Sequence, residues 1–68
     1  MLIRARLSEG GGYYQFRCPL CVRWHSIFSE QVAIVYNGHC ADADRDFSVR
    51  YHSPAGVGSD VHVEFQPT

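Results

Sequence analysis

Apolar and polar residues alternate along most of this 68-residue chain, and a period of two is the pattern of half-buried β-strands. Near the N-terminus, for example, Ile3, Ala5 and Leu7 fall on one face and Arg4, Arg6 and Ser8 on the other. Strands are predicted at residues 2–8, 13–17, 22–28, 47–52 and 61–65. The pattern therefore predicts a small all-β fold of antiparallel hairpins, with five to six short strands and little or no helix.

Turn residues separate these segments. Three consecutive glycines, Gly10–Gly12, predict a flexible turn, and Asn37-Gly38 predicts a tight one. Residues 42–45 are expected to form an exposed loop, and the glycine-rich segment 53–60 is expected to join the last two strands into a hairpin. Between residues 29 and 36 a short helix competes with a strand, and the β-branched residues there favour the strand.

The length of the chain bounds its stability and its number of domains. Sixty-eight residues predict a single domain, 1–68, whose core alone gives marginal stability. Apolar residues make up 46% of the chain, which is typical of a globular protein, and the net charge is −1. The chain therefore carries no strong overall field that would attract nucleic acid.

Cys18-Pro19-Leu20-Cys21 is the strongest chemical motif in the sequence. A Cys-x-x-Cys pair on a turn directs two thiolates at one point, which suits tetrahedral Zn²⁺. Cys40 is the only other thiol, and eighteen residues separate it from Cys21, a spacing typical of the two halves of a zinc ribbon. We expect it to lie on a second turn, after Asn37-Gly38, and to supply the third ligand.

The fourth zinc ligand is expected to be a histidine. His25 follows Cys21 by four positions and is preferred, while His39 is the alternate and His52 a weaker candidate. His39 is disfavoured because residues adjacent on an extended chain, here His39 and Cys40, point to opposite sides. The predicted metal site is therefore Cys18, Cys21, His25 and Cys40.

Catalysis is not expected at this site. Three cysteines and one histidine would complete the coordination sphere and leave no position for a reacting water. The zinc-protease pattern His-Glu-x-x-His is absent, as is the deaminase pattern His-x-Glu. The prediction is a non-enzymatic protein with Zn²⁺ as a structural cofactor.

The segment from Phe16 to Cys21, with His25 and the later Tyr36-Asn37-Gly38, resembles a family of small zinc-ribbon proteins of unknown function that is common in phages and prophages. The resemblance covers about 40 residues. Tyr51 stands where that family has a cysteine, and the family's closing cysteine and histidine are absent. The resemblance implies a phage or mobile-element origin, no established enzymatic activity and the cytoplasm of a host cell as the location.

Arginine and aromatic side chains are the candidates for partner binding. Arg4, Arg6, Tyr13 and Trp24 belong to the residue types that dominate binding hot spots. The first hypothesis is an interaction module, encoded by a phage, that modulates a host protein. The alternative is a zinc ribbon that binds nucleic acid, with the aromatic rings as stacking platforms. No apolar run is long enough to suggest a signal peptide or a membrane span, and three cysteines favour a reducing cytosol.

Overall fold

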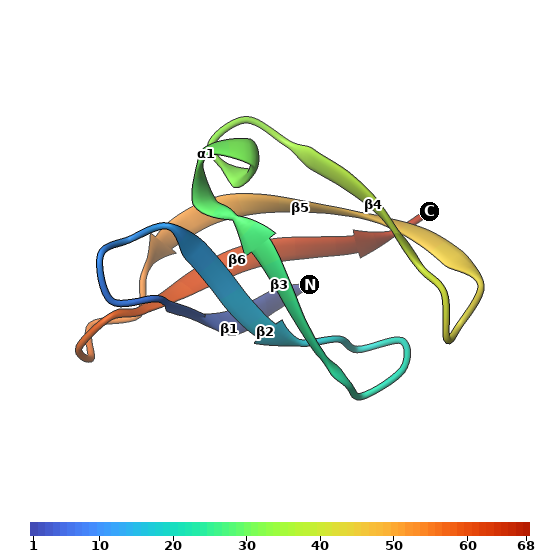
Figure 1. The fold of residues 1–68 in the computed structure, drawn as a ribbon, viewed down its shortest axis with the longest axis horizontal. Helices are drawn as coiled ribbons and strands as arrows, with labels where there is room; N and C mark the ends of the chain where they lie inside the picture. The colour runs from blue at the N-terminus through green and yellow to red at the C-terminus, as the bar shows by residue number, and fades with distance from the viewer.

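Six antiparallel strands form one sheet in the computed structural model, which describes residues 1–68 (Figure 1). Their bounds are β1 Leu2–Leu7, β2 Tyr13–Arg17, β3 Trp24–Phe28, β4 Tyr36–Cys40, β5 Arg45–Pro54 and β6 Asp60–Pro67. The strand order is β3-β2-β1-β6-β5-β4, so β3 and β4 are the two edges. The predicted all-β fold of antiparallel hairpins is confirmed, and the β5–β6 hairpin pairs as expected.

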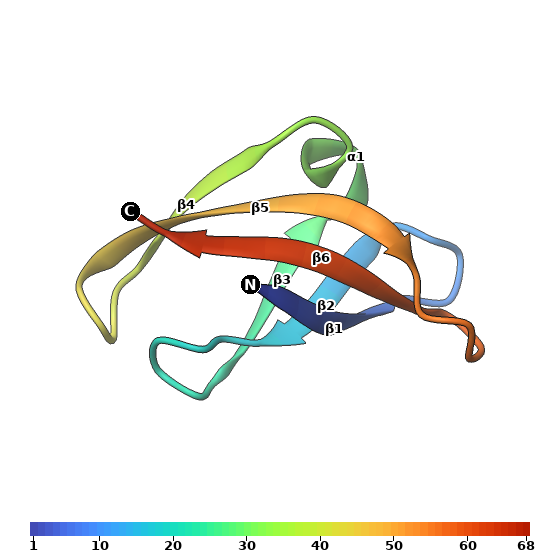
Figure 2. The ribbon, with the colours of Figure 1, turned by 180° about the vertical axis from the view of Figure 1, so that it is seen from behind.

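The sheet curls strongly about its concave face, as the two opposite views show (Figures 1 and 2). β2 and β5 are separated by two other strands, so in a flat sheet they would lie about 14 Å apart at the usual strand spacing. The ring centroids of Phe16 on β2 and Phe47 on β5 are nevertheless only 6.4 Å apart. This curvature brings side chains from both halves of the sheet into one core.

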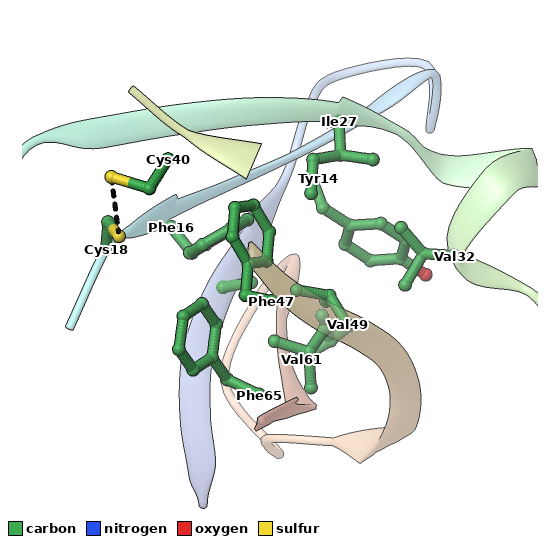
Figure 3. Close-up of a cluster of buried hydrophobic side chains, with 12 residues drawn as sticks. Tyr14, Phe16, Cys18, Ile27, Val32, Cys40, Phe47, Val49, Val61 and Phe65 are labelled. Carbon is green, nitrogen blue, oxygen red and sulfur yellow. Dashed lines mark hydrogen bonds between the residues drawn. The ribbon is translucent and has the colours of Figure 1, made fainter. Parts of the chain in front are cut away.

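The core consists of the inward-facing residues of the alternating pattern (Figure 3). Phe16, Phe47 and Phe65 form its centre, with Phe47 and Phe65 stacked at 5.2 Å between ring centroids. The buried cluster is Ala5, Tyr14, Phe16, Cys18, Ile27, Val32, Cys40, Phe47, Val49, Val61, Val63 and Phe65. Cys18 and Cys40 thus belong to the same cluster as the aromatic rings.

The strand predicted between residues 29 and 36 is wrong except at its last residue, Tyr36. Ser29–Val32 form the short helix α1, and β4 begins only at Tyr36. This segment must cross from one sheet edge to the other, where a strand would find no partner. The helical turn instead buries Val32 completely, and the Ser29 hydroxyl donates a hydrogen bond of 2.6 Å to the Gly11 carbonyl. α1 is the only helix and is much too short to cross a membrane.

Asn37-Gly38 does not form the predicted tight turn. Both residues lie within β4, where Gly38 pairs with Phe47 of β5, and the chain turns later, at residues 41–44. A β-carbon on Gly38 would lie 2.5 Å from Tyr36 Cε2 and 2.9 Å from Phe47 Cζ. Gly38 is therefore required by close packing of two aromatic rings and not by a turn. The glycine turn before β2 is observed as predicted, with Gly10 and Gly11 at positive φ.

Gly38→Ala tests this packing. Because Phe47 is buried and cannot move aside freely, we expect the substitution to lower the free energy of unfolding by about 1–3 kcal/mol. Gly12→Ala is the matched control, since a β-carbon there meets no atom within 4 Å and the backbone lies outside the left-handed region. Chemical denaturation of both variants gives the comparison, and equal stability of the two would contradict the packing role.

Candidate metal centre

The connection between β2 and β3 folds into a compact turn that begins at Cys18. The Cys18 amide donates to the Arg23 carbonyl at 2.7 Å, and the Val22 amide donates to the Cys18 carbonyl at 2.8 Å. Within this turn the Leu20 amide points at Cys18 Sγ, 3.4 Å away. Backbone amides that donate to a sulfur hold it as a hydrogen-bond acceptor, which is the state that a metal ligand needs.

Val22 carries backbone strain in this turn. Its φ is +58°, a left-handed conformation that β-branched residues rarely adopt, and its side chain is 68% exposed. Packing of the Val22 side chain therefore does not explain the conformation. The turn is held by its hydrogen bonds, and its conformation lets Cys21 before Val22 and His25 after it face the same point.

Cys40 reaches the same point from the opposite edge of the sheet, where it is the last residue of β4. Its sulfur lies 3.9 Å from that of Cys18 (Figure 3), and Cys21 Sγ lies 3.5 Å from His25 Nε2. The ligand atoms of Cys18, Cys21, His25 and Cys40 all lie within 4.8 Å of one another. No disulfide joins them, since a bonded pair of sulfurs would be about 2.05 Å apart. The four residues could therefore hold one metal ion.

The surroundings of this Cys₃His cluster are largely apolar. Cys18 and Cys40 are fully buried, and Cys21 and His25 are partly buried. The imidazole of His25 packs beside two rings of the core, with its centroid 5.8 Å from that of Phe16 and 6.1 Å from that of Phe47. The core therefore fixes the orientation of the ring and presents Nε2 to the sulfurs.

The three sulfurs perturb one another's ionisation. The Ala43 amide, together with the amide of Asp42, donates to Cys40 and lowers the pKa of its thiol despite burial. The Arg23 amide lowers the pKa of the Cys21 thiol, but desolvation and the neighbouring sulfurs of Cys40 and Cys18 outweigh it and raise that pKa to about 11. Three clustered thiolates without a cation are unfavourable, and a bound divalent ion would reverse that repulsion.

The other candidate ligands lie outside the cluster. His39, the alternate fourth ligand, points away from Cys40 and contacts Asp46 at 2.7 Å and Asp44 at 3.3 Å. The hydrogen bond to Asp46 is the main reason why the pKa of His39 is raised. His52 lies exposed on β5, 3.2 Å from the Ser53 hydroxyl. Between the two histidines weighed most closely, the structure places His25 in the cluster, as the sequence favoured.

The four candidate partner-binding residues lie on the outer face of the sheet, away from the metal centre. Arg4 and Arg6 alternate with the buried Ala5 on β1, and Tyr13 and Trp24 are 44% and 65% exposed. The sequence did not single out Phe28, whose ring stacks beside Tyr13 at 5.0 Å. Phe28 could have been predicted only from the strand register that pairs it with Tyr13 across β2 and β3.

Comparison of the chain with protein families, with curated proteins and with solved structures gives no match. The resemblance to the phage zinc-ribbon family therefore stays a prediction. What is established about this protein comes from its own sequence and geometry: an all-β sheet and a Cys₃His cluster able to bind a metal ion.

Val22→Asn should stabilise the metal-loaded protein. Asparagine tolerates the left-handed region, and the exposed valine side chain contributes little packing. A gain of about 1 kcal/mol, or roughly 4–8 °C in melting temperature, is expected. Val57→Asn replaces an equally exposed valine that has no positive φ, and its melting temperature should not rise. Equal melting temperatures for the two variants would show that Val22 is not strained.

His25→Asn and His39→Asn separate the two candidate ligands. Loss of a direct ligand should weaken metal binding by at least roughly 100-fold, more than the loss of a residue that only supports a ligand. His39→Asn should leave the affinity within about twofold of the parent. Competition titrations with Co²⁺, whose visible absorption reports a tetrahedral sulfur and nitrogen environment, measure both. If His39→Asn weakened metal binding more than His25→Asn did, His39 and not His25 would be the fourth ligand.

Proposed function

We propose that the protein is a small, non-enzymatic binding module whose fold depends on one structural Zn²⁺. The single observation that carries the proposal is the convergence of four ligand atoms from the two opposite edges of the sheet. Cys18, Cys21 and His25 come from the β2–β3 turn and edge strand β3, and Cys40 comes from edge strand β4. One bound ion would join edges that no backbone hydrogen bonds join.

The spacing of the ligand atoms supports zinc. Bonds of about 2.3 Å to sulfur and about 2.0 Å to nitrogen, arranged tetrahedrally, separate two sulfurs by about 3.8 Å and a sulfur from a nitrogen by about 3.5 Å. Two of the six distances in the cluster match these values, 3.9 Å between Cys18 and Cys40 and 3.5 Å between Cys21 and His25, and all six are within 4.8 Å. A set of three thiolates and one imidazole also favours zinc over the hard cations that prefer oxygen.

A structural role fits this site better than a catalytic one. All four tetrahedral positions would be filled by the protein, whereas a catalytic zinc keeps one position for water or substrate. The cluster contains no carboxylate that could act as a base. Two of its sulfurs are fully buried among the aromatic rings of the core. These features support a site that holds the fold together.

The binding role is assigned to the exposed outer face. Tyr13, Trp24 and Phe28 are large aromatic side chains that the fold leaves in solvent, with arginines on the neighbouring strands. Aromatic residues and arginine are the types that dominate binding hot spots. A phage origin and a host protein as the partner stay predictions of the sequence.

Zinc removal should unfold the protein. Structural Zn²⁺ contributes about 10–16 kcal/mol of apparent binding free energy in zinc-finger peptides near neutral pH, far more than a core of this size supplies. We expect one equivalent of zinc in protein purified without chelators, and loss of the β-sheet circular dichroism and of cooperative melting when a strong zinc chelator is added. Lowering the pH should release the ion as well, because the thiolates and the imidazole take up protons.

Cys40→Ser tests the same dependence on zinc by mutation. It removes the only ligand from β4 while the Cys18–Cys21 turn stays intact. The variant should bind zinc far more weakly and melt without cooperativity. Arg23→Gln is the control, since it removes only the exposed 3.5 Å ion pair to Asp42 between the same two turns. A protein that stays folded after complete metal removal would refute the proposal.

A further inference from the structure

The outer surfaces of β1, β2 and β3 form one continuous face that the metal centre does not use. Strand register places Arg6 beside Gln15 and Gln15 beside Ser26, and it places Arg17 beside Trp24. All the outward-facing side chains of these three strands are exposed. They are Leu2, Arg4, Arg6, Tyr13, Gln15, Arg17, Trp24, Ser26 and Phe28, called here the Arg/aromatic face.

The charge of this face is opposite to that of the whole chain. It carries three arginines and no acidic residue, although the chain has a net charge of −1. The rest of the molecule therefore carries −4. The nearest carboxylate is at the border, on β6, where Asp60 lies 3.9 Å from Arg4 Nε, and both side chains are solvent-accessible. A weakly acidic protein thus presents one locally basic surface.

Trp24, the first residue of edge strand β3, has arginines beside it on the Arg/aromatic face. One side of it is covered by Arg17, whose guanidinium carbon lies 5.9 Å from the ring centroid. Two open hollows, of 310 and 360 Å³, adjoin the indole, and Arg6 lines both. Arg4 and the border residue Asp60 also line the larger one. A planar group in either hollow would contact the indole and bring an attached anion within reach of Arg6 or Arg4.

A second aromatic platform lies further along the same strands. Tyr13 and Phe28 are cross-strand partners, and their rings are 5.0 Å apart. Phe28 follows Trp24 by four positions on β3, which corresponds to about 13 Å along a strand. The two platforms can therefore hold two non-adjacent planar groups of one extended chain.

We propose that the Arg/aromatic face binds single-stranded nucleic acid, with bases stacked on Trp24 and on the Tyr13–Phe28 pair and phosphates paired with Arg4, Arg6 and Arg17. The inference rests on the proposed function, because the zinc-stabilised fold sets the position of the three strands. Stacking on exposed rings needs unpaired bases, so a single strand fits better than a duplex. A combination of cationic and aromatic side chains without acids suits a polyanion that carries planar groups.

The test titrates zinc-loaded protein with a single-stranded oligothymidylate of about 12 nucleotides at low salt. Trp24 is the only tryptophan, so its fluorescence reports directly on the face and should be quenched. Three phosphate contacts predict that the logarithm of the binding constant falls with the logarithm of salt concentration with a slope of about −2. A duplex of the same length should bind more weakly and quench less.

Variants separate stacking from charge. Trp24→Ala, measured by anisotropy of a labelled oligonucleotide, should weaken binding roughly 5- to 100-fold. Arg6→Gln should weaken binding and reduce the salt slope by about 0.7. Arg50→Gln is the matched control, since Arg50 is also exposed on the outer side of the sheet but lies on β5, two strands beyond β1 and opposite Glu64. It should bind as the parent protein does.

Three results would overturn the inference: no binding at low salt, equal losses in Arg6→Gln and Arg50→Gln, or tighter binding of a polyglutamate peptide than of the oligonucleotide. The last result would instead identify an acidic protein segment as the partner. Bound zinc and circular dichroism are measured on every variant. Protein that holds one zinc and stays folded but fails to bind the oligonucleotide would refute this inference and leave the metal-dependent fold standing.

Discussion

The two edges of the curled sheet meet at a cluster of three sulfurs and one imidazole nitrogen, and this junction governs the rest of the structure. A sheet that curls this far normally either closes by hydrogen bonds between its first and last strands or leaves both edges open. Here β3 and β4 share no such bonds, yet Cys18 and Cys40 approach to 3.9 Å. Ligation of a metal ion by these side chains would take the place of backbone pairing at this junction.

This arrangement explains why so small a core is sufficient. Only twelve residues are buried, and the aromatic rings at their centre come from strands on both sides of the sheet. Without a link between the edges, uncurling would separate Phe16 from Phe47 and expose both. A metal link would also account for the strained conformation of Val22. The gain from directing the cysteine side chains at one ion would outweigh the cost of a left-handed valine.

The strands and the ligand set could be predicted from the sequence, because both leave a recognisable pattern in it. Alternation defined the faces of β1, β2, β5 and β6, and the Cys-Pro-Leu-Cys turn with its downstream histidine pointed to His25. The predictions for two segments were wrong, because contacts with residues distant in the sequence override local conformational preference. α1 forms where the chain changes edges and Val32 enters the core, and Gly38 serves the rings of Tyr36 and Phe47. No local sequence pattern predicts the burial of Val32 or the packing of Gly38 against these rings.

Alternation of side chains along the β2–β3 hairpin links the candidate metal centre to the Arg/aromatic face. On β3, His25 faces the metal centre and Trp24, its neighbour, faces solvent, while on β2 the inward Phe16 precedes the outward Arg17. An ion that holds the His25 ring in place therefore also holds the backbone that carries Trp24. Since β3 is an edge strand with one neighbour, release of its ligand would free it to fray and would move Trp24 relative to Arg6. Coordination of a metal ion on one side of β3 would in this way also set the geometry of the Arg/aromatic face on the other side.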